Sequence, residues 1–307
     1  MVNDSLSKEI KHLGKSSGID TIGFADASEF SNYLINPHQR QNPKLALPNA
    51  KSIIVAGIYI GGVTMPEWEN PWYGRTSRLY LSEFFLDVVK PLEPISDFLK
   101  TNGYQAIVCD GTREGGSILP LKLAAIRAGL GWQGKHSLLV SKQFGTFLAL
   151  GGIITDAELD HSAIEEPDRC RSCDKCQTAC PVAALDQPYV LEMKKCMSYQ
   201  LQVDGLSEEV QAAMDNRVGD CEICQDSCPW NAKHLKAPLI TTMTNHFQRK
   251  IEEWGDSFYL PNLSRLSENG YKNIFGHLNT GISYDLFRRN VLIAMENAEK
   301  QSGKTNK

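Results

Sequence analysis

Nine cysteines are the residues of this 307-residue sequence whose spacing points most directly to a chemistry. Eight of them lie within the 59 residues from Cys170 to Cys228, and Cys109 alone lies outside that stretch. The first four form the run Cys-x2-Cys-x2-Cys-x3-Cys-Pro, which ends at Pro181. This is the spacing of bacterial ferredoxins, in which the fourth thiolate binds a different [4Fe–4S] cluster from the first three.

The remaining cysteines complete two sets of four ligands. Cys196 is followed by a second run, Cys-x2-Cys-x3-Cys-Pro, which begins at Cys221. By the crossing rule of ferredoxins, we predict that one [4Fe–4S] cluster is bound by Cys170, Cys173, Cys176 and Cys228, and the other by Cys180, Cys196, Cys221 and Cys224. Zinc also accepts four thiolates, but it does not require the longer run. A reducing cytosol would not keep these cysteines as disulfides.

The composition is that of an ordinary globular protein. The chain is 42% hydrophobic and 22% charged, with a formal net charge of −4, which excludes collagen-like and disordered chains and gives no general attraction to nucleic acid. No apolar run reaches the roughly 18 residues of a membrane helix, and the first residues lack the apolar core of a signal peptide. We therefore expect a cytoplasmic protein with no membrane contact and about two domains.

Strand and helix signals alternate before the cysteines and become helical after them. Apolar and β-branched runs predict strands over 21–25, 52–60, 106–109, 137–140 and 146–155. Helical periodicity predicts helices over 5–16, 77–90, 119–128, 246–254 and 284–300. Pro91 and Pro94 predict a break or kink, followed by a further helix that ends at residue 100. We expect the last residues, 301–307, to be a frayed tail.

These elements predict an α+β protein with three parts. An α/β domain over residues 1–160 precedes a two-cluster, ferredoxin-like domain over residues 161–235, and a short helical segment covers residues 236–307. A plain ferredoxin would be a fraction of this length. The N-terminal domain is therefore expected to hold the reacting centre that the clusters supply with electrons.

The stretch from Cys109 to Ser137 has the richest chemistry of the N-terminal domain. Asp110 directly follows a predicted strand, where active-site loops of α/β sheets begin. The glycine spacing matches neither a phosphate-binding loop nor a dinucleotide fingerprint. Taken alone, Asp110 would more often be a cap or turn residue, His136 a partly buried histidine and Lys135 a solvated charge.

Four segments together resemble the epoxyqueuosine reductase family. They are GLGWQGKHSLL, the first cysteine run, KKCMSY and CEICQDSCPWN, and the resemblance extends from the N-terminus to Asn231, with a weaker echo from Phe287 to Ala298. Members of this family depend on cobalamin and two [4Fe–4S] clusters, and they reduce epoxyqueuosine in tRNA to queuosine. The resemblance implies a cobalamin-binding N-terminal domain, a tRNA anticodon loop as partner, an external low-potential electron donor and a monomeric enzyme.

The resemblance also implies roles for individual residues. Asp110 matches the acidic proton donor of the family, which would protonate the opened epoxide after single electrons have reached cobalt through the clusters. The residues that match its cobalamin contacts are Arg75, Asp110, Lys135, His136, Ser137, Ser198, Cys221 and Glu222. The sequence has no Asp-x-His-x-x-Gly motif, so base-off cobalamin without a protein histidine ligand is implied.

Two departures from the family concern substrate recognition. The segment after Asp110 reads Gly-Thr-Arg-Glu-Gly-Gly where the family typically has Ser-x-Pro-Val-Leu-Glu, and fewer than 80 residues follow Pro229, whereas many members carry a longer helical-repeat domain. One alternative is therefore a reductive dehalogenase-like or other small-molecule reductase with the same cofactors. A second alternative is a non-catalytic electron-transfer protein, which would bind clusters but no cobalamin. No role is assigned to Cys109.

Overall fold

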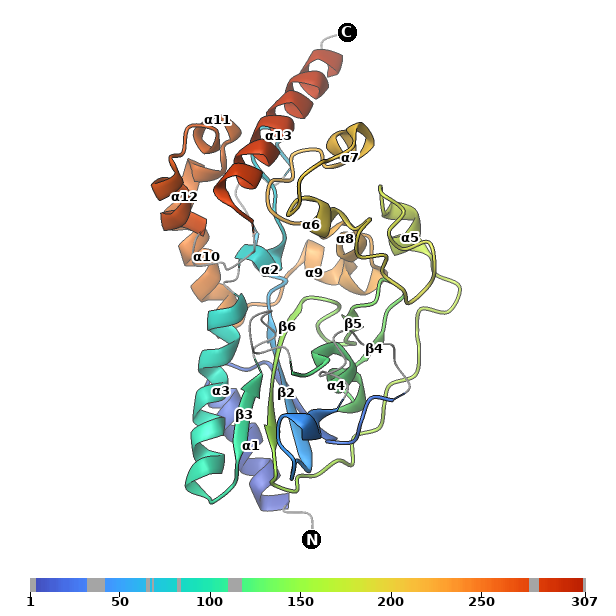
Figure 1. Ribbon diagram of the computed structural model, residues 1–307, viewed down its shortest axis with the longest axis vertical. Coiled ribbons are helices and arrows are strands. Elements are labelled where there is room, and N and C mark those ends of the chain that lie inside the picture. Colours follow the sequence, from blue (N-terminus) through green and yellow to red (C-terminus); the bar gives the residue numbers. More distant parts are fainter. Residues whose placement is uncertain are drawn as a thin grey trace.

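A four-stranded antiparallel sheet forms the centre of the N-terminal part of the computed structural model (Figure 1). The structure describes residues 4–31, 42–64, 67, 69–81, 84–109, 118–275 and 282–305. In spatial order, the strands are β1 (Thr21–Asp26), β2 (Ser52–Tyr59), β6 (Leu148–Thr155) and β3 (Ala106–Cys109). The longest pairing joins β2 to β6 over eight residues, from Ser52 opposite Thr155 to Tyr59 opposite Leu148.

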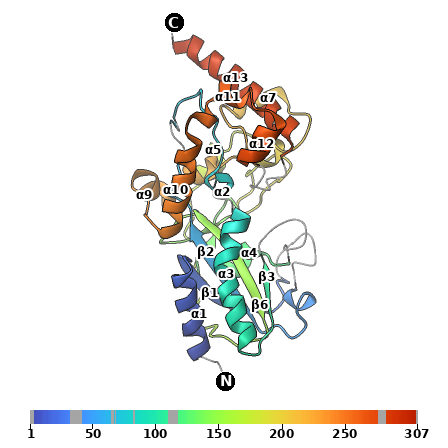
Figure 2. The same cartoon turned by 90° about the vertical axis from the view of Figure 1, so that its left-hand side faces the viewer.

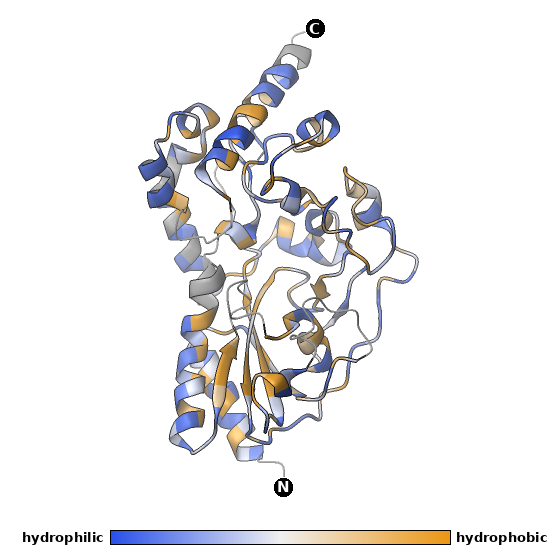
Figure 3. Cartoon of the chain, viewed as in Figure 1, coloured by the Kyte–Doolittle hydropathy of each residue, from blue (hydrophilic) through white to orange (hydrophobic). Residues whose placement is uncertain are grey.

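Helices cover both faces of this sheet, so β2 is buried at every position. Ile54 and Ile58 belong to the core that β2 shares with α1 (Asp4–Ser16) and α3 (Phe84–Thr101). Ile53 and Val55 belong to the opposite core, which α4 (Leu121–Arg127) covers. Alternate residues of a strand point to opposite faces, and a strand buried on both faces needs apolar residues at successive positions. Figure 3 shows the resulting apolar sheet.

Helix α3 corrects one prediction. It runs from Phe84 to Thr101 without interruption, although Pro91 and Pro94 lie inside it. Each proline removes one backbone donor from the helix. The apolar stripe of Leu92, Ile95 and Leu99, which is fully buried against the sheet, offsets that cost, so the predicted break does not occur.

The cysteine-rich part contains short helices and a small apolar core. Its helices are α5 (Lys175–Ala179), α6 (Met197–Gln200), α7 (Glu208–Ala213), α8 (Ile223–Asp226) and α9 (Ala232–Lys236), and a 3-10 turn covers Pro229–Asn231. Within the described residues, the buried apolar side chains of this core are Met197, Leu201 and Met214. Further contacts must therefore hold this part together.

The C-terminal helices extend the core of the N-terminal part. They are α10 (Thr242–Trp254), α11 (Leu260–Leu263), α12 (Glu268–Phe275) and α13 (Tyr284–Thr305), and Figure 2 shows them beyond the end of the sheet. Phe275 and Phe287 lie in the same hydrophobic cluster as Tyr80. The mixture of helices and sheet confirms the predicted α+β class. None of the described helices is both long enough and apolar enough to cross a membrane.

The end of α13 corrects a second prediction. The helix continues to Thr305, so the described residues 301–305 are helical rather than frayed. Trp72 donates a hydrogen bond from Nε1 to Ser302 Oγ at 3.3 Å, and Gln301 donates to Asp215. These two contacts anchor the last turns of α13 to distant parts of the chain.

Candidate functional site

The thiols of the first predicted ligand set influence one another electrostatically. Burial is the main reason that the pKa of Cys228 rises to about 11, and the thiols of Cys170, Cys176 and Cys173 add to the rise. Burial also raises the pKa of Cys176, again with a contribution from Cys170 and Cys173. Cys228 lies 52 residues after Cys176 in the sequence, so the fold brings it to the first run.

Burial also dominates the pKa shifts in the second set. Burial raises the pKa of Cys221 to about 12, with a smaller contribution from Cys196, and raises the pKa of Cys224 well above its usual value. The neighbours that add to the shift of Cys224 are Cys221, Cys196, Cys176 and Cys180. No three His, Cys, Asp or Glu side chains of the described residues form a site for a single metal ion.

The chemistry of these donors fits iron–sulfur clusters. A buried thiol with a raised pKa keeps its proton until a metal replaces it, since metal binding requires the thiolate. The eight clustered cysteines supply the number of thiolates that two cubane clusters require. The donor set therefore suits the chemistry that the sequence predicts.

Local backbone geometry explains the two Cys-Pro pairs. Cys180 ends α5 in an extended conformation with φ −71° and ψ 110°. Cys228 has φ −71° and ψ 124° before the turn that begins with Pro229. A proline disfavours the helical conformation of the residue before it. Each proline therefore keeps the cysteine before it out of the helical conformation, and the two helices that precede these cysteines, α5 and α8, pack against each other.

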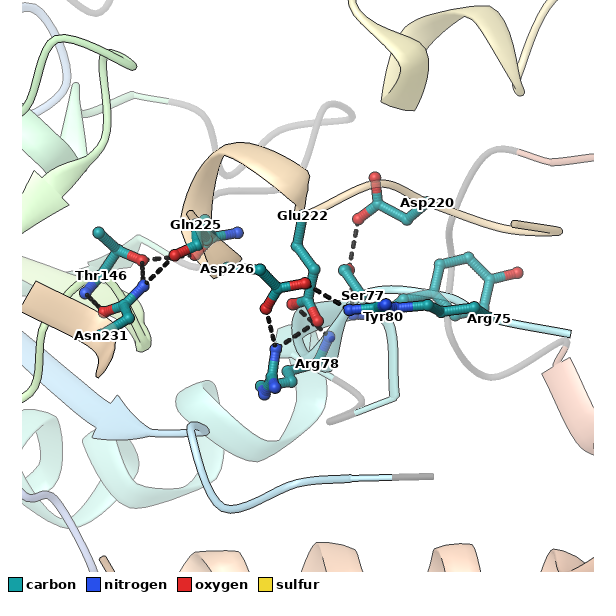
Figure 4. Close-up of polar contacts among 10 residues, drawn as sticks. All are labelled: Arg75, Ser77, Arg78, Tyr80, Thr146, Asp220, Glu222, Gln225, Asp226 and Asn231. Atoms are coloured by element: carbon teal, nitrogen blue, oxygen red, sulfur yellow. Dashed lines mark hydrogen bonds and ion pairs between the residues drawn. The ribbon is translucent and has the colours of Figure 1, made fainter. Parts of the chain in front are cut away.

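A buried ion network joins the predicted contact Arg75 to helix α8 (Figure 4). Arg78 forms ion pairs with Glu222 and, at 3.1 Å, with Asp226, and its backbone amide donates to Glu222 Oε2 at 3.0 Å. Arg75 pairs with Asp226. The side chains of Arg78 and Glu222 are only 4% and 3% exposed. Burial raises the pKa of Glu222 to about 7, and Arg78 opposes that rise.

A second set of polar contacts reaches the same cysteine segment. Ser77 Oγ donates to Asp220 Oδ2 at 2.5 Å, and the backbone amide of Cys221 donates to Asp220 Oδ1 at 2.7 Å. Ser198, a predicted cofactor contact, also hydrogen-bonds Asp220 and lowers the pKa of that buried carboxyl group, which burial raises. Segments 75–78, 198 and 220–222 therefore form one continuous strip, which we call the Arg75 strip.

The predicted contacts Lys135, His136 and Ser137 lie in the turn of a hairpin between β4 (Trp132–Gln133) and β5 (Leu139–Val140). His136 is 3% exposed. Its Nδ1 atom accepts a hydrogen bond from the amide of Leu138 at 3.2 Å. Burial, with the charge of Lys122, lowers the pKa of His136 to about 4. The imidazole is therefore neutral at physiological pH.

Two buried polar atoms border these segments. Thr76 Oγ1, in the Arg75 strip, and Trp132 Nε1, at the base of the hairpin, have no hydrogen-bond partner among the described residues. Buried polar atoms are normally paired, so each segment offers a polar group that a bound cofactor could satisfy. The Trp132 ring also packs edge-on against Trp230, with ring centroids 4.7 Å apart.

The structure also reveals residues that the sequence did not single out. Asn231 accepts from the amide of Thr146 at 2.8 Å and donates to the Gln225 carbonyl at 2.7 Å, so it joins the segment before β6 to α8 (Figure 4). Gly145 permits this contact, because a Cβ atom there would lie 1.9 Å from Asn231 Oδ1. The CPWN motif was the only signal for Asn231, and a buried partner such as Arg78 has no sequence signature.

Cys109 and Asp110 stand at the end of the edge strand β3 in the sequence. Asp110 lies outside the described residues, so its predicted role is not placed. Cys109 precedes it as the last residue of β3, opposite Gly152 of β6, and it is fully buried in the core beneath α4. This position favours packing, rather than reactivity, as the role of Cys109.

Comparisons with known proteins agree with this geometry. Residues 169–231 match the family described as a 4Fe–4S double cluster binding domain. The epoxyqueuosine reductase of Lactococcus garvieae is 30% identical over 97% of this chain and 88% of its own length. The epoxyqueuosine reductase of Bacillus subtilis is 28% identical over 80% of this chain and 73% of its own length.

Solved structures are similar over the same extent. A crystal structure of epoxyqueuosine reductase with a tRNA-Tyr epoxyqueuosine-modified tRNA stem loop has a TM-score of 0.80 and 26% identity, and the alignment covers 97% of this chain and 83% of that one. A reductive dehalogenase has a TM-score of 0.51 and 18% identity, over 88% of this chain and 37% of that one. The dehalogenase likeness shows a shared fold alone.

Proposed function

Because this chain belongs to the epoxyqueuosine reductase family, we propose that it reduces epoxyqueuosine to queuosine in tRNA with two [4Fe–4S] clusters and cobalamin as cofactors. It is an iron–sulfur oxidoreductase, since the double-cluster domain at residues 169–231 contains all eight clustered cysteines. The observation that carries the proposal is the position of these thiols beside two segments, the Arg75 strip and the β4–β5 hairpin, that match cobalamin contacts of the family. When bound, the clusters carry single electrons and the cobalt of cobalamin supplies the reducing power.

The thiol groups support a particular division of ligands. We propose that one cluster is bound by Cys170, Cys173, Cys176 and Cys228, and the other by Cys180, Cys196, Cys221 and Cys224. The thiols that raise the pKa of Cys228 all belong to its proposed set. Those that raise the pKa of Cys224 are the other three of its own set and Cys176 of the neighbouring set.

The protein's own side chains would hold cobalamin from two sides. The Arg78–Glu222 pair keeps the Arg75 strip against α8 and excludes water from that contact. On the hairpin, His136 is neutral and its Nδ1 atom already accepts the Leu138 amide. Since Nδ1 accepts this bond, the neutral ring carries its proton on Nε2 and has no free lone pair for cobalt, which supports base-off cobalamin without a histidine ligand.

Asp110 is the proposed proton donor. It directly follows Cys109, whose position in the sheet is fixed by pairing of β3 with β6. Its carboxyl group would deliver a proton to the oxygen of the opened epoxide. General acid catalysis of this kind contributes about 100-fold to 10,000-fold to a rate.

The remaining proposals concern the surroundings of the enzyme. We propose that it acts on the anticodon loop, as a monomer in the cytoplasm, and that an external low-potential donor reduces its clusters. A single-stranded loop allows a protein to reach an unstacked base. The dehalogenase-like alternative has only a shared fold in its favour, and a purely electron-carrying role does not agree with membership in a family of reductases.

The proposal is tested with protein reconstituted anaerobically with iron, sulfide and cobalamin. We expect retained corrin, about eight irons per chain, and formation of queuosine from an epoxyqueuosine-modified tRNA stem loop, detected by mass spectrometry. Asp110→Asn should lower turnover at least about 100-fold with unchanged cofactor content, and Asp97→Asn on the exposed face of α3 serves as the matched control.

Each contrary result removes a different part of the proposal. Full turnover in Asp110→Asn would exclude Asp110 as the donor. Retained corrin without queuosine would exclude the tRNA substrate. A protein that retains iron but no corrin would instead support the role of a non-catalytic electron-transfer protein.

A further inference from the structure

Tyr189 connects the hairpin to the first cysteine loop through three hydrogen bonds. Its backbone amide donates to the carbonyl of Lys135 at 2.9 Å. Its carbonyl accepts from Gln133 Nε2 at 3.2 Å. Its hydroxyl donates to Asp168 Oδ2 at 2.6 Å. Two of these bonds hold the end of β4 and the turn that follows it, and the third contacts the segment before Cys170.

The partners of Tyr189 close a ring. The other oxygen of Asp168, Oδ1, accepts from the backbone amide of Cys170 at 2.7 Å. Lys135 Nζ donates to the carbonyl of Arg171 at 2.7 Å. The path from Lys135 through Tyr189, Asp168, Cys170 and Arg171 therefore returns to Lys135. The first cluster ligand and a predicted cobalamin contact belong to the same closed set of hydrogen bonds.

The backbone at this junction is strained in three places. Arg171, Ser137 and Tyr189 have φ angles of +47°, +63° and +69°, and they are three of the six described non-glycine residues with positive φ. Each such conformation costs about 1 to 2 kcal/mol and persists only where the surroundings enforce it. Arg171 is exposed and Tyr189 is only half-buried, so hydrogen bonds rather than core packing must enforce the strain.

We propose that Tyr189 is a positioning residue that fixes the hairpin carrying Lys135, His136 and Ser137 relative to the loop that carries Cys170. Through Asp168 its hydroxyl orients the amide of Cys170, and amides near the sulfurs of a cluster influence its reduction potential. Through its backbone it holds the turn that would contact the corrin. This inference rests on the proposed function, because it presupposes that cluster and corrin occupy these two sites.

Two substitutions separate the two sides of the junction. Tyr189→Phe removes only the bond to Asp168, and Gln133→Leu removes only the bond to the Tyr189 carbonyl. The matched control is Tyr284→Phe, which loses a hydroxyl bond of similar length, 2.7 Å to the Leu266 carbonyl, in the C-terminal helices. In each holoprotein, the midpoint potentials of both clusters are measured by electron paramagnetic resonance, and corrin reduction is followed by stopped-flow absorbance.

In Tyr189→Phe, we expect the equilibrium constant for reduction of one cluster to change about tenfold, a shift of about 59 mV for a one-electron couple, with the other cluster unchanged. In Gln133→Leu, we expect corrin reduction to slow at least threefold with both potentials unchanged. The control should match the wild type in both measurements.

The inference is overturned if both variants match the control. If Tyr189→Phe loses its iron, the rate of corrin reduction in Gln133→Leu becomes the test of the inference. A slower rate than in the wild type supports the inference, and the wild-type rate overturns it. A wild-type protein that retains no corrin would contradict the proposed function instead. In that case, the cluster potentials of Tyr189→Phe still test the positioning role.

Discussion

The charged residues behind the cysteine segment are buried in pairs rather than alone. Arg78 is matched by Glu222 and Asp226, and Asp220 is matched by the hydroxyl of Ser77 and the amide of Cys221. A buried ion pair adds little net stability, because desolvation offsets the attraction, but loss of one partner is costly. The network therefore specifies where α8 lies against the Arg75 strip.

His136 shows how burial controls a single residue. In the unfolded chain its imidazole takes up a proton near pH 6.5, whereas in the folded protein it stays neutral down to about pH 4. The unfolded state therefore binds more protons between these values, and the stability due to His136 falls as the pH falls through this window. From pH 7 to pH 5, this loss is about 2 kcal/mol in the free energy of unfolding.

The measurement is anaerobic urea unfolding at both pH values, for the wild type and for His136→Gln. The wild type should lose about 2 kcal/mol more than the variant between pH 7 and pH 5. An equal loss in the two proteins would mean that His136 carries a proton in the folded state. The carbon-13 resonance of its Cε1 atom provides an independent reading of the protonation state.

At the scale of the element, α13 acts as a clamp on the long loop between Cys196 and Cys221. Asn290 is fully buried, and its Nδ2 atom donates to the carbonyls of Leu201 and Val218, both at 3.0 Å. One helix therefore satisfies carbonyls at both ends of the loop. These bonds explain how a C-terminal helix supports a cysteine segment that lies far away in the sequence.

Asn290→Ala should lower the free energy of unfolding by about 1 to 3 kcal/mol, because it leaves the Val218 carbonyl without this donor. The Leu201 carbonyl keeps a bond from Arg289 at 3.2 Å. Urea unfolding of the holoprotein measures this loss. Asn273→Ala is the matched control, since Asn273 is an exposed asparagine on α12. If both variants unfold at the same urea concentration, the carbonyls have found other partners and the clamp is not required.

The same scale shows what the sequence could predict. The apolar run at 52–60 predicted β2, because a strand buried on both faces requires uninterrupted apolar residues. The cysteine spacing predicted the double-cluster domain that residues 169–231 match, because the spacing is characteristic of [4Fe–4S] ligands. Both signals are local in the chain.

What the sequence could not predict depends on distant contacts. The order of the strands, β1-β2-β6-β3, brings residues nearly 100 positions apart into register. The continuity of α3 through Pro91 and Pro94 is decided by the packing of Leu92 and Leu99, not by local propensity. The roles of Arg78 and Tyr189 depend on partners in other segments of the chain. Local sequence periodicity does not predict such partners.

At the scale of the whole molecule, we expect the stability of the cysteine-rich part to depend on its metal more than that of the sheet does. Its separate hydrophobic cluster is small and is formed by Met197, Leu201 and Met214, whereas large clusters cover the sheet on both faces. Small units without a sufficient core usually need a metal or a disulfide. Removal of iron should therefore unfold residues 169–231 before it affects the strands.

Hydrogen exchange after chelation of iron tests this order and the clamp together. Amides of residues 169–231 should exchange at least about tenfold faster, and those of β2 and β6 should keep their protection, because the apolar cores that cover the sheet remain intact. Helix α13 should also exchange faster, although it contains no cysteine, because release of the Leu201 and Val218 carbonyls removes the partners of Asn290. Helix α1, which packs on the sheet through Leu6 and Ile10, is the internal control. If exchange in α13 is unchanged while residues 201–218 exchange faster, the packing around Phe275 and Phe287 is enough to stabilise the helix. In that case, α13 stabilises the loop, but the loop does not stabilise α13.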